Sequence, residues 1–300
     1  MIKQYLLILL FFSLISFPIP INAQTYKGVN WSGNLYLGAS NMMGDLGGSN
    51  FIGSRGIFDW DIKATRPAVG GGLSAHMGGL SLSANFLLTR LAGNDAYSGQ
   101  NFQSDRNLSV RTDLIESNLC IEYRPWNRKK EFNRFYIYSG IGGIYYQPKA
   151  KYADTWHKLR TLGTEGQFLE DNKPYNELAL VIPYGIGYKF RLAKSSSIIL
   201  DLGFRKTFTD YLDDVSSVYA DPLLIGAEKG PIAQDLSNQS LSPKAIGDKR
   251  GNPDNMDSYH VLSVKYEYIF GGKSGDGCYY NRNPPKSRST RINQRRMFIK

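Results

Sequence analysis

The chain of 300 residues carries 36 Lys and Arg against 26 Asp and Glu, a net charge of +10, and 42% of its residues are hydrophobic. This hydrophobic share excludes a disordered chain, and a mean hydropathy of −0.34 argues against a helical membrane protein. Two Cys and three His exclude a disulfide framework and a zinc cluster of the usual kind. The 20 Tyr, 15 Phe and 31 Gly favour a β-rich protein instead.

Residues 1–23 have the plan of a secretory signal peptide. One Lys precedes an apolar run from Tyr5 to Phe17, and the small residue Ala23 lies directly before Gln24. The run is short for a membrane anchor, which needs about 20 residues. We therefore expect cleavage after Ala23. Beyond this segment the sequence has no stretch of the length and apolarity of a membrane helix, so a mature chain in a membrane must be a closed β-barrel.

Eight segments alternate at period two, the pattern of a strand whose two faces differ. In chain order they are 32–41, 68–78, 79–91, 109–125, 134–147, 178–191, 197–210 and 258–270. In the last segment one face is apolar and aromatic from Leu262 to Phe270, whereas the other carries Ser263, Lys265 and Glu267. Phe270 is expected to close the final strand, as an aromatic residue commonly does at the periplasmic rim of a barrel.

The connections between these segments alternate between short and long. Short turns are expected at Gly78-Gly79, 127–133 and 193–196, and long polar loops at 42–67, 93–108, 148–177 and 211–257. This alternation predicts an all-β fold, an eight-stranded antiparallel transmembrane β-barrel with short periplasmic turns and long extracellular loops. A soluble sandwich or lipocalin-like barrel is the alternative, but it would bury the apolar face inside and its loops need not alternate.

Several charged residues are expected to point into the barrel. Such charges must be paired, since an unpaired one costs several kcal/mol in so dry a site. We predict that they form a structural ion-pair network that makes the barrel solid; a proton relay or ion path is the alternative. The residues are Glu116, Glu122, Arg124, Lys189, Asp201, Arg205, Lys265 and Glu267.

The sequence does not support enzyme chemistry, a cofactor or a metal. His260 is expected near the outer end of the last strand on the lipid-facing side, where Leu262 rather than a serine shares its face, so a Ser–His–carboxylate set is not assembled. Asp210, Asp213 and Asp214 offer oxygen ligands for Ca²⁺ but lack EF-hand spacing. They are expected to form a solvated acidic loop.

Three signatures extend beyond the barrel pattern. They are Leu162-Gly163-Thr164-Glu165-Gly166-Gln167, the segment TDYLDDVS at 209–216, and IPYGIG at 182–187 together with Gly44-Asp45-Leu46. Their order and spacing, over residues from about 30 to 270, resemble the PorG-type outer-membrane barrels of Bacteroidota. The resemblance implies a barrel of the type IX secretion system that contacts a periplasmic ring, made of a lipoprotein and its partner subunit, and supports gliding motility in some species.

The segment 271–300 is a separate, basic unit. It holds eight Lys and Arg against Asp276 alone, and its Gly, Ser, Asn and Pro residues predict a flexible periplasmic tail. The periplasm has no nucleic acid, so acidic protein surfaces or an anionic cell-wall polymer are the expected partners; an inert extension is the alternative. The expected partner-binding residues lie in the turn at 127–133 with its flank and in the tail: Arg128, Lys129, Lys130, Arg134, Arg288, Arg291, Arg295 and Arg296.

The chain is therefore expected to divide into a signal peptide (1–23), an outer-membrane barrel (24–270) and the tail (271–300). The leading hypothesis is a non-enzymatic barrel component of the type IX secretion and gliding machinery, with outer-membrane lipid and the periplasmic ring proteins as partners. The second hypothesis is a stand-alone surface barrel that serves adhesion or ligand binding through its outer loops. The first requires partner contacts on the periplasmic turns and tail, the second on the outer loops.

Overall fold

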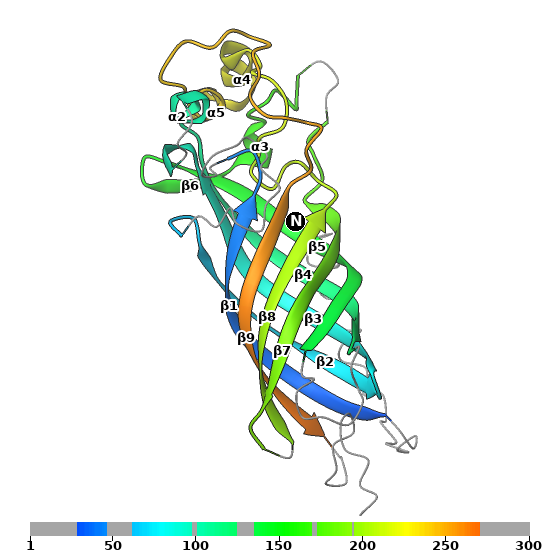
Figure 1. Cartoon of the computed structure of the whole chain (residues 1–300). Coiled ribbons are helices and arrows are strands. Elements are labelled where there is room, and N and C mark those ends of the chain that lie inside the picture. Colours follow the sequence, from blue (N-terminus) through cyan, green and yellow to red (C-terminus); the bar gives the residue numbers. More distant parts are fainter. Residues whose placement is uncertain are drawn as a thin grey trace, which may run out of the picture.

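The chain forms a closed antiparallel β-barrel. The computed structural model describes residues 29–46, 62–97, 101–124, 135–169, 173–193 and 195–270. Adjacent strands pair around the ring, β1 pairs with β9, and β4 pairs with β5, so the sheet closes on itself (Figure 1). The predicted fold class is confirmed. The eight barrel strands are β1 (Asn30–Met43), β2 (Arg66–Met77), β3 (Leu80–Asn94), β4 (Ser109–Tyr123), β5 (Phe135–Tyr152), β7 (Leu178–Arg191), β8 (Ser196–Thr207) and β9 (Ser258–Phe270).

Short turns lie at one end of the barrel. Gly78-Gly79 joins β2 to β3, with Gly78 at φ 64°, a left-handed conformation that tight hairpin turns require. Residues 192–195 join β7 to β8. The expected turn at 127–133, the signal peptide and the tail lie outside the described residues. In the part of the chain that the structure describes, no helix has the length and apolarity needed to cross a membrane.

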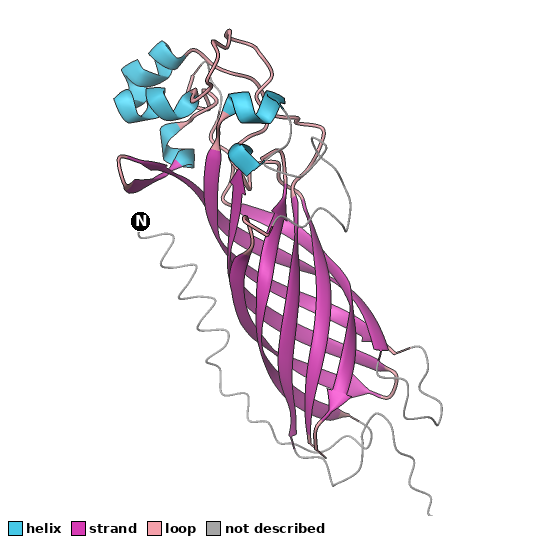
Figure 2. Ribbon diagram, turned by 60° about the vertical axis from the view of Figure 1, so that its left-hand side comes forward, coloured by secondary structure: helices cyan, strands magenta, loops and turns pink. Residues whose placement is uncertain are grey.

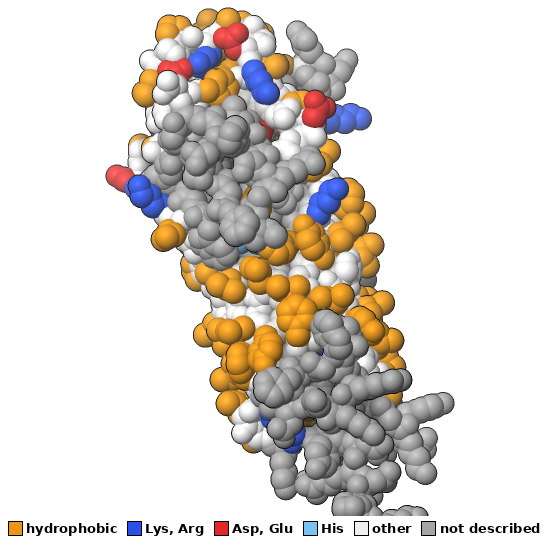
Figure 3. Space-filling model, viewed as in Figure 1, with side chains coloured by type: hydrophobic (Ala, Val, Ile, Leu, Met, Phe, Trp, Pro, Cys, Tyr) orange, Lys and Arg blue, Asp and Glu red, His pale blue; other side chains and the backbone are white. Residues whose placement is uncertain are grey.

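The outward face of the barrel is an apolar belt, as the sequence predicts. Leu35 is 73% exposed and Leu37 is 70% exposed. Hydrophobic side chains extend across the face of the barrel that is in view in Figure 3. Aromatic side chains gather on the outward face toward the short-turn end, where Trp31 pairs with Phe270 in the register. A continuous exposed apolar surface of this size is covered by lipid, and an aromatic girdle marks the interface. The belt therefore places the barrel in a membrane.

The interior has two halves of different character. Toward the short turns it is lined by Ser, Tyr and charged side chains, as expected. Toward the long loops it is apolar: Leu87, Leu91, Leu114, Ile144 and Val181 are all buried there. The polar and charged inner face that Ser263, Lys265 and Glu267 indicate for the last strand does not extend into this half. The reason is that the loops fold back onto the barrel, and buried Leu46, Leu212 and Val215 close its apolar core.

One long loop contributes an additional hairpin. β5 continues to Tyr152 and pairs with β6 (Thr155–Lys158), although the sequence pattern predicted a loop from residue 148. Ala153 and Asp154 have φ of 45° and 66°, the geometry of a primed two-residue turn. Ala-Asp lacks the Asn-Gly or Asp-Gly signature of such turns, so the sequence did not signal this one.

The remaining described loop residues form a compact cap beyond one end of the barrel (Figure 2). The short helices of this cap are η1 (Asp95–Tyr97), α2 (Asn101–Arg106), α3 (Leu159–Leu162), α4 (Pro222–Lys229) and α5 (Pro231–Ser237). Asp221 begins α4, because its carboxylate accepts a hydrogen bond from the Leu223 N–H and Pro222 occupies the first turn.

Candidate functional site

The predicted partner-binding residues cannot be placed. Arg128, Lys129, Lys130, Arg134 and the four tail arginines at 288, 291, 295 and 296 lie outside the described residues. The residues predicted to point into the barrel are described, and so are the loop signatures. These two groups, the lumen and the cap, are the candidate sites of the molecule.

Three cation–carboxylate pairs span the lumen. Lys189 lies 2.6 Å from Glu267, Lys265 lies 3.1 Å from Asp201, and Arg205 lies 3.3 Å from Glu116. Hydroxyl groups complete the shells of these carboxylates: Tyr136 and Tyr138 donate to Asp201, and Tyr259 donates to Glu116. Each carboxylate is thus bonded by groups from other strands, which braces the barrel from within.

Two of the predicted lumen residues are held by hydrogen bonds to neutral groups. Glu122 accepts a bond of 3.0 Å from the Ser83 hydroxyl. Arg124 donates to the Ser81 hydroxyl at 2.7 Å and to the Gly78 carbonyl at 3.1 Å, at the short-turn end. Arg124 therefore ties the β2–β3 turn to the end of β4.

His76 forms a set that the sequence did not indicate. Its Nε2 lies 2.8 Å from the Ser32 Oγ and 3.4 Å from the Glu267 Oε1, and its Nδ1 lies 2.7 Å from the Ser81 Oγ. In a nucleophile–base relay the serine and the carboxylate bind opposite ring nitrogens, as Ser81 and Glu267 do here, but the serine must also be accessible to a substrate. All four side chains are buried. The set is suited to bracing the lumen and not to acyl transfer.

His260 lies near the loop end of β9 in the same outward row as the exposed Leu262, as expected. It is nevertheless only 1% exposed and lies beside the Phe204 ring of β8, with centroids 6.1 Å apart.

The loop signatures converge in the cap. Asp213 from the 209–216 signature accepts hydrogen bonds through Oδ2 from the N–H groups of Asp45 and Leu46, at 2.9 and 3.1 Å. Asp213 thereby joins two signatures that are 168 residues apart in the chain. A Cβ at Gly44 would lie 2.7 Å from that same oxygen, so only glycine fits there. The close approach of the two segments explains the glycine of the Gly-Asp-Leu signature.

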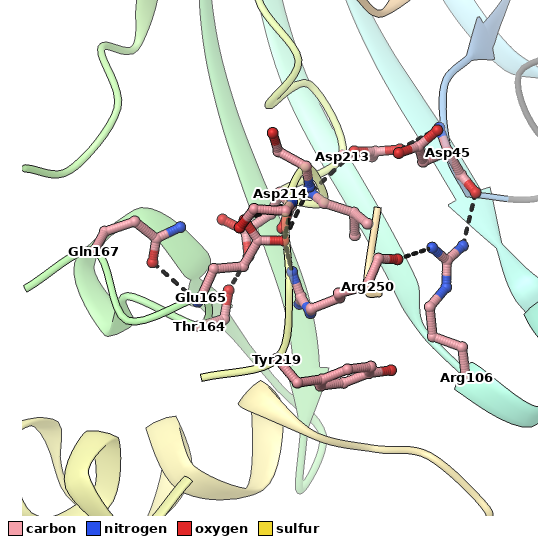
Figure 4. Close-up of polar contacts among 12 residues, drawn as sticks. Asp45, Arg106, Thr164, Glu165, Gln167, Asp213, Asp214, Tyr219 and Arg250 are labelled. Carbon is pink, nitrogen blue, oxygen red and sulfur yellow. Dashed lines mark hydrogen bonds and ion pairs between the residues drawn. The ribbon is translucent and has the colours of Figure 1, made fainter. Parts of the chain in front are cut away.

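The 162–167 signature joins the same cluster through Glu165 (Figure 4). Its carboxylate accepts from the Ser216 N–H at 2.9 Å, from the Ser217 hydroxyl at 2.9 Å, and from the Arg250 Nη1 at 2.7 Å. The neighbouring Thr164 hydroxyl donates to Asp214. These contacts give the signature a structural role, because they dock the third long loop onto the fourth.

Glycines shape the 162–167 signature itself. Gly163 has φ 65° and ends α3, and its N–H donates to the Leu159 carbonyl, while Gly166 has φ 75°. Both conformations are left-handed and favour glycine. The remaining signature, at 182–187, lies in β7 in the barrel wall and not in the cap.

Two buried arginines complete the cap. Arg106 bonds both carboxylate oxygens of Asp95 at 2.8 Å and donates to the carbonyls of Asp45 and Arg250, at 2.7 and 2.6 Å. Arg250 donates to Glu165 and to the Asp214 carbonyl, both at 2.7 Å. The sequence offered no signal for either arginine, since the partners come from loops up to 144 residues away.

The acidic segment is not a solvated loop, which corrects the sequence-based expectation. Asp213 and Asp214 are buried, and burial raises the pKa of Asp214 to about 6. Burial together with the carboxylates of Asp45 and Glu165 raises the pKa of Asp210 to about 8. Over the described part of the chain, no group of three His, Cys, Asp or Glu side chains is arranged to hold a metal ion. Asp213 accepts hydrogen bonds from loop N–H groups, and Asp214 accepts from the hydroxyl groups of Thr164 and Tyr175.

The outer surface of the cap carries exposed apolar side chains. Leu223 is 71% exposed and Leu224 is 52% exposed, both on α4, and Leu241 and Ile246 are also exposed. The cap thus presents an apolar outer surface above a cluster of buried, hydrogen-bonded charges.

Comparisons with known proteins give only distant likenesses. No family model matches the chain, and no curated protein matches it. Among solved structures it is similar to Ail, the attachment invasion locus protein of Yersinia pestis, in complex with the heparin analogue sucrose octasulfate: TM-score 0.35 and 8% identity, over 81% of this chain and 99% of Ail. It is also similar to Neisserial surface protein A, with TM-score 0.32 and 8% identity, over 80% and 96% of the two chains. For a major outer membrane protein of Thermus thermophilus the TM-score is 0.34 and the identity 14%, over 80% and 99%. Likenesses of this strength carry no information on function.

Proposed function

We propose that this chain is a non-enzymatic outer-membrane barrel of the type IX secretion and gliding machinery, with its long loops outside the cell and its termini in the periplasm. The observation that carries the proposal is the convergence of the loop signatures behind the PorG resemblance. Gly44-Asp45-Leu46, 162–167 and 209–216 meet in one buried cluster through Asp213 and Glu165. Their combination therefore reflects one shared loop architecture, which supports a relationship to that family.

The packed lumen supports a role without transport through the barrel itself. The three lumen ion pairs and the apolar core above them fill the interior. A solid barrel suits an anchor, on which the periplasmic ring, made of a lipoprotein and its partner subunit, assembles. The basic turn and tail are the surfaces proposed to meet that ring, since charge speeds and orients docking.

Co-purification from native membranes tests this role. Wild-type protein with an affinity tag should bring down the ring proteins. Replacing Arg128, Lys129 and Lys130 with Glu and deleting residues 273–300 should weaken that association several-fold, while the barrel stays folded. Arg106→Met is the matched control, because it alters the cap and leaves the periplasmic end intact. Ring association and secretion at wild-type levels in the first variant would refute the docking role.

A second candidate is a surface barrel that binds a protein or ligand through its cap. The exposed apolar side chains of Leu223, Leu224 and Leu241 favour it. In this case Leu223→Ser with Leu224→Ser should abolish the function in cells, and the turn-and-tail variant should not. The two candidates thus predict opposite results for the same pair of variants.

Orientation can be measured separately. In a background in which Ser replaces both cysteines, Cys at Lys173 or Glu228 should react with an impermeant thiol reagent on whole cells. Cys at Ala193, exposed in the β7–β8 turn, should react only after the outer membrane is opened. The reverse pattern would overturn the proposed topology.

A further inference from the structure

A row of positive charge crosses three neighbouring strands on the outer face of the barrel. The register pairs Arg111 of β4 with Lys149 of β5, and Lys149 with Lys158 of β6. Residues paired across antiparallel strands point to the same side of the sheet, with Cβ atoms about 5 Å apart. Arg111 lies in the same outward row of β4 as the exposed Ile115. The three cations therefore stand side by side on the lipid-facing side.

This row lies directly beyond the apolar belt. Leu88, Ile115 and Tyr145 pair across β3, β4 and β5 as an apolar row, and the next outward residues are Arg90, Asp113 and Gln147. Arg111 and Lys149 follow two residues further on. Each such step advances about 7 Å along a strand, and about 5 Å along the membrane normal for a strand tilted by about 45°. The cations thus lie at the height of lipid headgroups.

The charges of this surface are not balanced. Asp113 accepts hydrogen bonds from Lys149 at 2.6 Å and from Arg90 at 2.8 Å, and the Arg111 Nε is 3.6 Å away. One carboxylate thus faces three cations, and Lys158 adds a fourth, exposed one. Glu177, bonded to Gln147 at 3.4 Å, adds a second carboxylate, so cations still outnumber carboxylates on this surface. Like charges placed directly opposite one another are destabilising. The surface is therefore complementary to an anion that carries more than one charge.

An aromatic side chain completes the surface. Trp156 of β6 pairs with Lys151 in the register, is 41% exposed, and has the Arg111 guanidinium 4.6 Å from the centre of its ring. Indole rings favour the boundary between lipid and water. Cations, an interfacial aromatic ring and an adjoining apolar belt together suit a phosphorylated lipid, with its phosphates on the cations and its acyl chains on the belt.

We infer that the basic patch formed by Arg90, Arg111, Lys149, Lys158 and Trp156 binds the phosphate groups of lipopolysaccharide in the outer leaflet. The inference requires the orientation proposed above, with the cap outside the cell, and is independent of any role in secretion. Bidentate donors such as Arg111 suit phosphate oxygens. Lipid held here would fix the barrel's depth and rotation in the membrane on the β3–β6 side.

Native mass spectrometry of the purified full-length protein in detergent provides the test. Bisphosphoryl lipid A should remain bound to the wild type at least tenfold more tightly than lipid A from which both phosphates have been removed. The triple variant R111Q/K149Q/K158Q should lose this preference. Lys206→Gln is the matched control, because Lys206 is an exposed lysine near the loop end of β8, away from the patch.

Several outcomes would overturn the inference. Equal retention of lipid A by the wild type and the triple variant would exclude the patch as its site. Equal retention of phosphatidylglycerol and bisphosphoryl lipid A would show a general phospholipid surface instead. If the triple variant fails to fold, the single variant Lys158→Gln is used, because the exposed Lys158 side chain lies on β6 outside the barrel ring. Lys158→Gln should weaken lipid A retention about threefold. Unchanged retention in this variant would count against the patch.

Discussion

The lumen and the cap bury charged groups in two different ways. In the lumen the backbone is already satisfied by the strand ladders, so each carboxylate binds side chains: Glu267 binds Lys189, and Asp201 binds Lys265 and two tyrosines. In the cap the backbone lacks a ladder, and the carboxylates take its place. Asp213 and Glu165 accept hydrogen bonds from loop N–H groups, and Arg106 donates to loop carbonyls.

The charged groups therefore contribute to the stability of the two regions in different ways. The lumen pairs sit inside a sheet whose shape the strands determine, so they add rigidity to a structure that exists without them. The cap charges define the path of the loops, because buried backbone groups must find partners. Loss of one charged group should therefore loosen the whole cap, whereas loss of one lumen pair should only lower the barrel's stability.

The largest effect is expected from filling the lumen. A Cβ at Gly187 would lie 2.2 Å from the Tyr136 ring, so Gly187→Val should prevent assembly, with less than a tenth of the protein reaching the folded state. Heat-modifiable migration after refolding measures this fraction. Gly143→Val is the control, since its nearest neighbour would be 4.0 Å away. Normal folding of Gly187→Val would show that packing in the lumen does not limit assembly.

Arg106→Met tests whether charge organises the cap. The change leaves the buried Asp95 without its bidentate partner, a loss of about 3–5 kcal/mol. Residues 211–257 should become sensitive to protease while the barrel still migrates as folded. Lys249→Met, at an exposed site, should leave cleavage unchanged. If the barrel unfolded together with the cap, the two regions would be one cooperative unit and the distinction would fail.

Glu267→Gln is expected to have a smaller effect on the barrel. Lys189 loses its charged partner, which should cost about 3 kcal/mol and lower the temperature at which heat-modifiable migration is lost. Glu122→Gln should change that temperature less, because Ser83 can still donate to the amide oxygen. Neither variant should conduct ions in planar bilayers. Steady single-channel conductance from the unmodified protein would show that the lumen is a channel.

The smallest effect is a pH dependence confined to the cap. The pKa values of Asp210, about 8, and Asp214, about 6, are above the ordinary value, so the folded cap binds protons that an open cap releases. Proton binding by these two carboxyl groups therefore stabilises the closed cap. This stabilisation is complete below about pH 4 and is lost as the pH rises through 6 to 8. Hydrogen exchange in 209–216, corrected for intrinsic rates, should be slower at pH 5.5 than at pH 8.5.

Asp210→Asn should reduce this difference, since the amide imitates the protonated carboxyl group, and Glu228→Gln at an exposed site should not. A wild-type cap that became more stable with rising pH would contradict the assigned pKa directions.

The sequence alone determined the barrel. Period-two alternation from Leu262 to Phe270 and in its seven counterparts located the strands, and the short and long connections ordered them into a closed sheet. Such patterns can be recognised in a sequence because residues i and i+2 of a strand lie on the same face, regardless of what that face packs against. The inward positions of Glu116, Asp201 and Glu267 followed from that parity, although the sequence could not say which cation each would meet.

Only the tertiary structure decided the cap. Asp213 looks like a solvated loop residue in the sequence, and Arg106 and Arg250 carry no local signal. Their burial depends on where four loops meet, with partners up to 168 residues apart. Where these loops fold back, the half of the lumen toward them is apolar. A local sequence pattern predicts local backbone geometry. The contacts between loops depend instead on the folded barrel, which brings the ends of the loops together.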